Sequence, residues 1–292
     1  MNGLVFAFLA LCTSVVGFLL AKSVLKTKSI FDPIAYAANS FMLGGIFATV
    51  FYFVTSFHLQ DFQNLFHGNM LLFLLLDVLA WAIGSLLFYP SFKHIPLSET
   101  TIIGSFQGFF VFLFGSFLFK TELLNLTRIS GGLLILFAII FLYYKKGSFT
   151  FNKYSALFFF AIAIFGLAAT LDSVIVVHKF FTIFFLLIFN FGLTGLTVLL
   201  LHLKSVPKLK ELYLYKKTRV IVILNSSLTF ISFVFIYNAY KLHVAASQVN
   251  MILSSQTILV VLFASIVFKE KNNVWKKIIA GMIAGIGVYL LS

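Results

Sequence analysis

Apolar runs with the length of a membrane-spanning helix recur along this 292-residue sequence. A helix needs roughly 20 apolar residues to cross the hydrocarbon core of a bilayer. Ten windows of about this size are present: residues 3–21, 33–57, 69–91, 97–119, 127–144, 154–173, 180–203, 219–240, 245–268 and 275–291. A strand in lipid would leave its backbone groups without partners. The sequence therefore predicts an all-α polytopic membrane protein with ten transmembrane helices.

The composition limits the function classes in the same direction. Apolar residues make up 61% of the chain and charged residues 10%, which is more apolar surface than a water-soluble fold can cover. The net charge of +13 is spread between the apolar runs, so it does not indicate a nucleic-acid partner. Cys12 is the single cysteine, which excludes a disulfide framework. We expect no metal and no cofactor. The partners that we expect are a small-molecule substrate and the lipid bilayer, for a monomer or homodimer.

The ten windows divide into two groups of five, and the groups resemble each other. The segment Phe88–Lys93 precedes Ile236–Lys241 by 148 positions, and both contain a Tyr-x3-Lys pattern. Further pairs, at offsets of 148 or 151, are Glu122 with Glu270, Arg128 with Lys276, and Asn39 with Asn190. We place one repeat at residues 1–146 and the other at residues 153–292. With five spans each, the copies must be inverted relative to each other. Such repeats are typical of secondary transporters, which bind substrate near the membrane midplane.

With these features the chain resembles the drug/metabolite transporter superfamily, and in particular its ten-helix EamA-type members. The resemblance extends over essentially the whole chain. Four features support the resemblance. They are the duplication, the Tyr-x3-Lys segment before the fourth span of each half, the glutamates Glu122 and Glu270 that end those spans, and the small residues Gly131 and Gly281 in the fifth spans. The resemblance implies a carrier, commonly an exporter of amino acids or other metabolites.

Lysine and arginine are distributed unevenly between the two sides of the predicted bundle. The odd-numbered connections hold seventeen of them and the even-numbered connections four. The positive-inside rule then places the odd connections in the cytoplasm and both termini outside. Members of the resembled family commonly have cytoplasmic termini, so the two arguments conflict, and we follow the charge count. We expect a multi-pass protein of the cell (inner) membrane with external termini.

Asp77 is the strongest candidate for a functional group inside the membrane. A charge at the centre of a span costs roughly 2.5–3.5 kcal/mol on insertion scales, so its presence needs a reason. Trp81 lies one turn further on the same helical face, and the repeat aligns Asn225 with Asp77. A carboxylate and an amide facing one cavity would bind an ammonium group or exchange a proton, which makes Asp77 the candidate for ion coupling. The alternative is that Asp77 serves packing alone.

Other polar residues inside the spans complete the predicted site. The candidate substrate-binding residues are Asp77, Trp81, Asn39, Gln107, Asn190, Asn225, Ser255 and Gln256. Amide and hydroxyl groups at such depth serve either a cavity or interhelical hydrogen bonds, and the sequence leaves both open. The repeat-related pairs Glu122–Arg128 and Glu270–Lys276 are predicted to be structural ion pairs. We expect Asp172 to lie in a solvated loop.

Three classes of function remain, and one explains the duplication. The chain contains neither a His-Glu-x-x-His nor a Gly-x-Ser-x-Gly pattern, so we predict that it is not an enzyme. A membrane receptor or scaffold would leave the inverted repeat unexplained. We predict a secondary transporter that exports small metabolites, such as amino acids, by alternating access. An intramembrane enzyme, a receptor or a scaffold are the alternatives.

Overall fold

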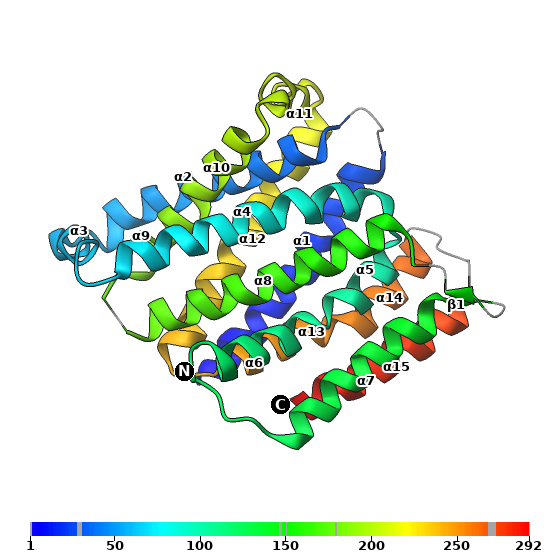
Figure 1. Ribbon diagram of the computed structural model, residues 1–292. Helices are drawn as coiled ribbons and strands as arrows, with labels where there is room; N and C mark the ends of the chain where they lie inside the picture. The colour runs from blue at the N-terminus through cyan, green and yellow to red at the C-terminus, as the bar shows by residue number, and fades with distance from the viewer. Residues whose placement is uncertain are drawn as a thin grey trace.

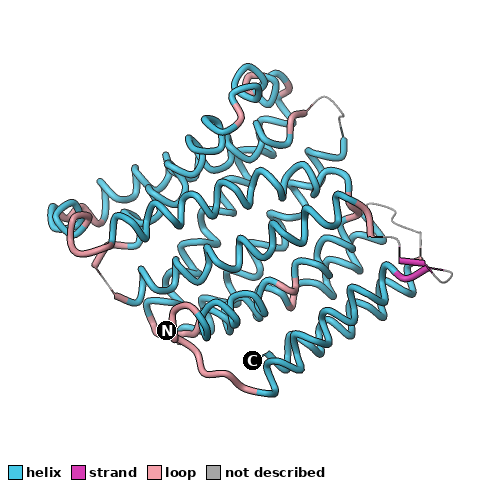
Figure 2. The backbone as a smooth tube through the Cα atoms, viewed as in Figure 1, coloured by secondary structure: helices cyan, strands magenta, loops and turns pink. Residues whose placement is uncertain are grey.

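The computed structural model describes residues 2–27, 31–145, 148–149, 151–178, 180–267 and 273–291, and nearly all of them are helical (Figures 1 and 2). The elements are α1 (Gly3–Thr27), α2 (Pro33–Thr55), α3 (Leu59–Asn64), α4 (Met70–His94), α5 (Leu97–Gly104), α6 (Gln107–Phe117), α7 (Leu126–Tyr143), β1 (Tyr144–Lys145), β2 (Ser148–Phe149), α8 (Lys153–Val177), α9 (Ile183–Leu187), the π-helix η1 (Ile188–Leu193), α10 (Thr194–Leu201), the 3-10 helix η2 (Leu203–Lys208), α11 (Glu211–Leu214), α12 (Lys216–Lys241), α13 (Ala246–Ser254), α14 (Gln256–Val267) and α15 (Val274–Leu291). The short strands β1 and β2 pair antiparallel.

The predicted class of all-α polytopic membrane protein is confirmed. Among the described residues, nine segments are long and apolar enough to cross a membrane. The window predicted at 245–268 forms the two shorter helices α13 and α14, so the structure does not establish a count of ten spans. Many large apolar side chains on the outer faces of the helices are exposed, for example Val54 at 77% and Leu200 at 70%. An apolar exterior of this kind suits lipid and not water.

Helices α1 and α8 both continue beyond the ends of their apolar windows, and each buries a charged residue near its end. Helix α1 continues to Thr27, so Lys22 lies within a helix and not in a connection, and its side chain is only 3% exposed. Helix α8 continues to Val177, which places Asp172 inside the helix at 4% exposure. The expectation that Asp172 lies in a solvated loop is therefore wrong. Both side chains are tolerated because hydrogen-bond partners surround them.

The helices of the first half pack mainly on helices of the second half. The principal pairs are α1 with α12, α4 with α8, α2 with η1 and α10, α6 with α13, α5 with α14, and α7 with α15. If the helices of the two halves are exchanged in chain order, the pair α1–α12 becomes α8–α4, and the pair α7–α15 is unchanged. At the α7–α15 contact a Cβ on Gly131 would lie 2.5 Å from the Gly287 carbonyl oxygen. Only glycine permits this approach of two backbones.

Three of the spanning segments are interrupted near their middle. Helix α5 ends at Gly104 before α6 begins at Gln107, and α13 ends at Ser254 before α14 begins at Gln256. The segment after Thr182 contains the π-helix η1 between two α-helical pieces. Pro90, in contrast, does not end α4, which continues to His94. The interruptions place backbone irregularities inside the bundle, where such irregularities are tolerated if they adjoin a cavity or other protein segments.

Candidate functional site

A cavity of about 220 Å³ lies between the two halves and is lined by residues of both. Its volume is several times the roughly 30 Å³ that one water molecule occupies in the liquid. It is smaller than the 300–1,000 Å³ that is usual for drug-sized ligands. The cavity therefore has the size for a small metabolite. Its lining comes from α1, α2, α4, α5, α6, α8, α12, α13 and α14 and includes the turn between α5 and α6.

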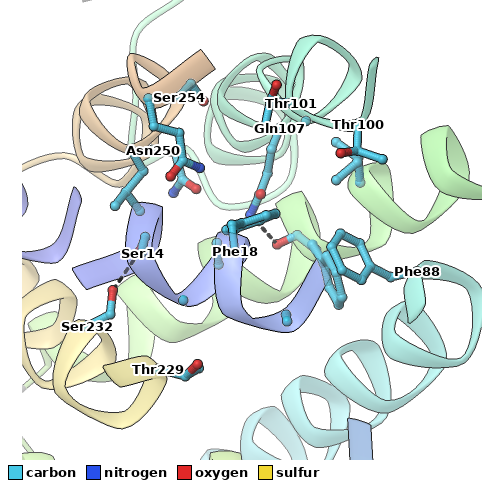
Figure 3. A pocket seen from close by; sticks show the side chains of 18 of the residues that line it. Ser14, Phe18, Phe88, Thr100, Thr101, Gln107, Thr229, Ser232, Asn250 and Ser254 are labelled. Carbon is cyan, nitrogen blue, oxygen red and sulfur yellow. Dashed lines mark hydrogen bonds between the residues drawn. The ribbon is translucent and has the colours of Figure 1, made fainter. Parts of the chain in front are cut away.

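Hydroxyl and amide groups line the cavity on several of its helices (Figure 3). Ser14 of α1 and Ser232 of α12 are joined by a hydrogen bond of 2.8 Å. Gln107 is the first residue of α6, and its side-chain amide donates to the Phe165 carbonyl oxygen at 3.4 Å. The side-chain oxygens of Asn225 and Gln256 are buried and have no hydrogen-bond partner. A ligand with N–H or O–H groups would satisfy these two acceptors.

Aromatic rings also line the cavity. Trp81 of α4 packs against Phe165 of α8 with ring centroids 4.9 Å apart and against Phe233 of α12 at 5.2 Å. Phe18 and Phe88 also line the cavity and are in edge contact at 6.3 Å. The rings come from helices of both halves. The cavity thus joins an apolar wall to a polar one, a combination typical of small-molecule sites.

Asp172 lies where the aromatic wall meets a buried polar cluster. Its carboxylate accepts hydrogen bonds from Trp81 Nε1 at 3.2 Å, from Asn190 Nδ2 at 3.1 Å and from the Tyr237 hydroxyl. These donors come from α4, η1 and α12, and Asp172 itself belongs to α8. Asp172 lines the cavity. Four segments that are distant in sequence therefore converge on one carboxylate.

Asp77 lies behind Asp172 and does not line the cavity. The Asn190 amide donates to Asp77 Oδ2 at 3.2 Å, so the same NH₂ group contacts both carboxylates. Asp77 Oδ1 is buried without a hydrogen-bond partner, and the Asp77 side chain is within hydrogen-bonding reach of Asp172. A small void beside the two carboxylates, lined by apolar residues and Tyr237, has no room for a water molecule. Asp77 is therefore sealed from the cavity by its neighbour.

The π-helix η1 explains how Asn190 reaches both carboxylates. A π-turn inserts an extra residue into a helix and rotates the following side chains relative to an α-helix. Asn190 lies within η1 and is 1% exposed. The opposite side of this segment contacts α2 closely, since a Cβ on Gly45 would lie 2.6 Å from Gly192 Cα. π-Bulges occur frequently at functional sites.

The structure brings together most of the sequence-predicted residues but not all of them. Trp81, Gln107, Asn225 and Gln256 line the cavity, and Asp77 and Asn190 form the cluster behind it. Two others lie elsewhere in the fold. Asn39 accepts a 2.6 Å hydrogen bond from the Tyr213 hydroxyl, and Ser255 is exposed and donates to the Ile252 carbonyl oxygen. Ser255 is the residue between α13 and α14.

Sequence reasoning missed two residues of the cluster. Asp172 is the second-last residue of the sixth apolar window, but the apolar residues Val174, Ile175 and Val176 after it indicate that the helix continues. Asp77 is consequently not the only carboxylate at depth. Tyr237 entered the sequence analysis only as part of a repeat motif, and no spacing on its helix marks it as a partner of a carboxylate.

The predicted ion pairs have different outcomes. Arg128 Nη1 donates to Glu122 Oε2 at 2.8 Å, and Glu122 Oε1 also accepts from the Ser247 backbone N–H at the start of α13. Glu270 lies outside the described residues, and Lys276 donates to the Tyr144 carbonyl oxygen. Across the part of the chain that the structure describes, no three His, Cys, Asp or Glu side chains are grouped to hold a metal ion.

Comparisons with known proteins give one family and one fold. Residues 1–144 match the EamA-like transporter family. No curated protein matches the sequence. A solved structure described only as the crystal structure of a protein is similar over 99% of this chain and 95% of the other, with a TM-score of 0.71 and 15% sequence identity. At that identity the similarity concerns the fold alone.

Proposed function

We propose that this chain, a member of the EamA-like transporter family, is a secondary transporter that exports small metabolites such as amino acids by alternating access. Family membership supports a membrane transporter. The substrate class, the direction of transport and the mechanism are our proposal. The observation that carries it is the cavity of about 220 Å³, because both halves line it and its size suits one small metabolite.

The contacts between the halves support alternating access around this cavity. The symmetric exchange of α1–α12 with α8–α4 is the pattern that two inverted five-helix repeats would produce. The helix interruptions at Gly104 and Ser255 adjoin the cavity, and such breaks let one part of a span tilt against the other. Rocking of the halves would open the cavity first to one side of the membrane and then to the other.

The energy for transport would come from a gradient. The sequence holds no Gly-x4-Gly-Lys-Ser/Thr pattern for nucleotide binding. We propose that Asp77, with its partner Asp172, is the proton site if transport is coupled to protons. An intramembrane carboxylate without a basic partner is the group that proton-coupled carriers use.

A substitution that fills the cavity gives a direct test of this assignment. Gly104 lines the cavity, and a Cβ added there would meet no atom within 4 Å. The first side-chain atom of a substitute therefore meets open space, and we expect the indole of Gly104→Trp to take up part of the substrate space. Val54→Trp is the matched control, because Val54 is 77% exposed on the outer face.

The measurement is the melting temperature of the purified protein in detergent against a panel of amino acids, amines, nucleosides and sugars. A ligand at a hundredfold excess over its Kd stabilises the folded state by about 2.7 kcal/mol. We expect a saturable shift with the wild type and Val54→Trp, and none with Gly104→Trp. A shift that persists in Gly104→Trp would place the ligand elsewhere and contradict the proposal.

A further inference from the structure

Asp172 is the one Asp, Glu, Lys, Arg or His side chain among the described residues that line the cavity. A cavity without a lysine or arginine offers no counter-charge to a phosphate or to a free carboxylate. It offers one to a cation. The charge of the lining therefore selects a positively charged ligand over a negatively charged one.

The groups around Asp172 match an ammonium group on a small organic molecule. The Asp172 carboxylate can accept a charge-assisted hydrogen bond from the ammonium group. The ring of Trp81 packs against those of Phe165 and Phe233, and aromatic faces attract cations. The carboxylate and the rings would contact different parts of such a ligand.

The burial of Asp77 beside Asp172 determines the protonation state of the two carboxylates. Both carboxylates are buried, and neither has a salt-bridge partner among the described residues. Two adjacent negative charges in this surrounding would be strongly unfavourable. The void beside them has no room for a water molecule, and hence none for a hydrated cation. A proton needs no such space.

The hydrogen bonds show which carboxylate holds that proton. Asp172 accepts three donated hydrogen bonds, which favours the ionised form. Asp77 accepts one, from Asn190, its other oxygen has no hydrogen-bond partner, and its side chain lies at the same small void as that of Asp172. A protonated Asp77 would donate to Asp172. The other titratable groups facing the pair are Tyr237 and Tyr240 of α12, while α9, η1 and α10 carry none.

We propose that Asp172 is the binding group for the ammonium of a small organic amine or amino compound, and that Asp77, carrying the proton of the pair, is the neighbour that keeps Asp172 the single negative charge at the cavity. This rests on the proposed function, and it narrows the metabolites proposed there to those with a net positive charge, because the lining does not pair the carboxylate of a zwitterionic amino acid. It also separates the two aspartates into a binding residue and a positioning residue.

The experiment compares three ligand charges on one scaffold. The probes are phenethylamine, its neutral counterpart phenylethanol and the anion phenylacetate, with propylamine and tyramine as further amines. Binding is measured by melting temperature and by calorimetry on the full-length protein in detergent. We expect the amines to bind and the neutral and anionic probes not to bind. The variants Asp172→Asn and Asp77→Asn then distinguish the two aspartates.

Asp172→Asn should weaken amine binding by about thirtyfold or more, as loss of one member of a buried charge pair does. Asp77→Asn places a neutral amide where the neutral acid stood, so Asp172 remains the single negative charge and amines should still be preferred over the neutral and anionic probes. Infrared spectra of the wild type at neutral pH should show the carbonyl band of a protonated carboxylic acid. That band should be absent in Asp77→Asn and present in Asp61→Asn, a control in which Asp61 accepts from the Thr182 backbone and hydroxyl.

Each contrary result would refute one named part of the proposal. Binding of phenylacetate or phenylethanol as tightly as phenethylamine, or no binding of any amine, would refute the ammonium site. If neutral or anionic metabolites bind and Gly104→Trp blocks them, the proposed transporter function stands and only the substrate class fails. If the variants do not fold, the infrared spectrum of the wild type still shows whether one carboxylic acid is protonated. Absence of the band would show that both carboxylates are ionised.

Discussion

Helices α1 and α8 hold corresponding positions in the two halves, and each buries one charged side chain. Both contain 25 residues, and Lys22 and Asp172 each lie five positions before the helix end. Lys22 donates to the carbonyl oxygens of Phe92 and Ile95 at the end of α4. Pro96 has no N–H to offer Phe92, so the lysine supplies the donor that the helix end lacks. The positive charge also lies at the negative end of the helix dipole.

Asp172 differs in what surrounds it. Its donors Trp81, Asn190 and Tyr237 stabilise the carboxylate, but a second acid lies behind it and a cavity lies in front. Asp77 also leaves one buried oxygen without a hydrogen-bond partner. The comparison gives a criterion for buried charges in a membrane bundle. A charge that completes the backbone of the fold is structural, whereas one beside unsatisfied polar atoms and open space is a candidate for ligand binding.

The largest effect on stability should follow loss of Lys22. In Lys22→Met the two carbonyl oxygens at the end of α4 lose their charged donor. We expect a loss of roughly 2–5 kcal/mol, from about 1–3 kcal/mol for each buried acceptor left unpaired. Thermal unfolding in detergent measures it. The control Lys26→Met alters an exposed lysine of the same helix and should change stability by no more than about 0.5 kcal/mol. Equal losses of stability in Lys22→Met and Lys26→Met would show that Lys22 does not stabilise the fold through these carbonyl oxygens.

A smaller effect should follow Trp81→Phe, which keeps an aromatic ring but removes the donor to Asp172. We expect a loss of roughly 1.5–3 kcal/mol, the range for a hydrogen bond to a charged group. The same change in an Asp172→Asn background should cost less, because the acceptor there carries no charge. A double-mutant cycle measures the difference as a coupling energy. Additive effects would mean that Trp81 serves packing against Phe165 and Phe233 alone.

The smallest effect concerns Asp32, a charged residue of the structural kind at the edge of the bundle. Burial raises the pKa of Asp32, but hydrogen bonds from the Ile34 and Ala35 backbone, Ser205 and Lys208 outweigh it and lower the pKa below 3.8. Its contribution to stability is then full above pH 3.8 and is lost as the pH falls through the lower folded-state value. Asn also caps helices well. Asp32→Asn should therefore cost less than about 1 kcal/mol at neutral pH, since its partner Lys208 is half exposed.

The pH dependence supplies the check on Asp32. The difference in melting temperature between the wild type and Asp32→Asn should shrink as the pH is lowered below 3.8. A difference that grows on acidification would have the wrong sign for a carboxylate with a lowered pKa. It would show that the uncharged cap, and not the charge, stabilises the start of α2.

The sequence was sufficient for the class of fold because lipid imposes simple rules. Apolar length predicted the spanning segments, and residues 33–57 and 127–144 agree with α2 and α7 to within two residues at each end. Helix ends were less predictable where charges enter the bundle. Lys22 and Asp172 ended their apolar windows early, since a hydropathy count cannot see the carbonyls and donors that accommodate them.

The site was predictable only where one span carries its own signal. Asp77 and Trp81 are deep and one turn apart, and both belong to the observed cluster or the cavity wall. Asn39 and Asn190 have the same repeat position, yet Asn39 pairs with Tyr213 while Asn190 joins the two aspartates. The π-helix that turns Asn190 toward them depends on packing against α2, which no local pattern encodes.

Transport itself is the central claim, and solute flux through proteoliposomes tests it most directly. The protein would be reconstituted beside protein-free vesicles and the Gly104→Trp variant, with exchange of the labelled compound that gave the largest thermal shift. We predict saturable exchange by the wild type and background flux by the filled-cavity variant. Binding without exchange by the wild type would contradict the carrier and favour a receptor or scaffold.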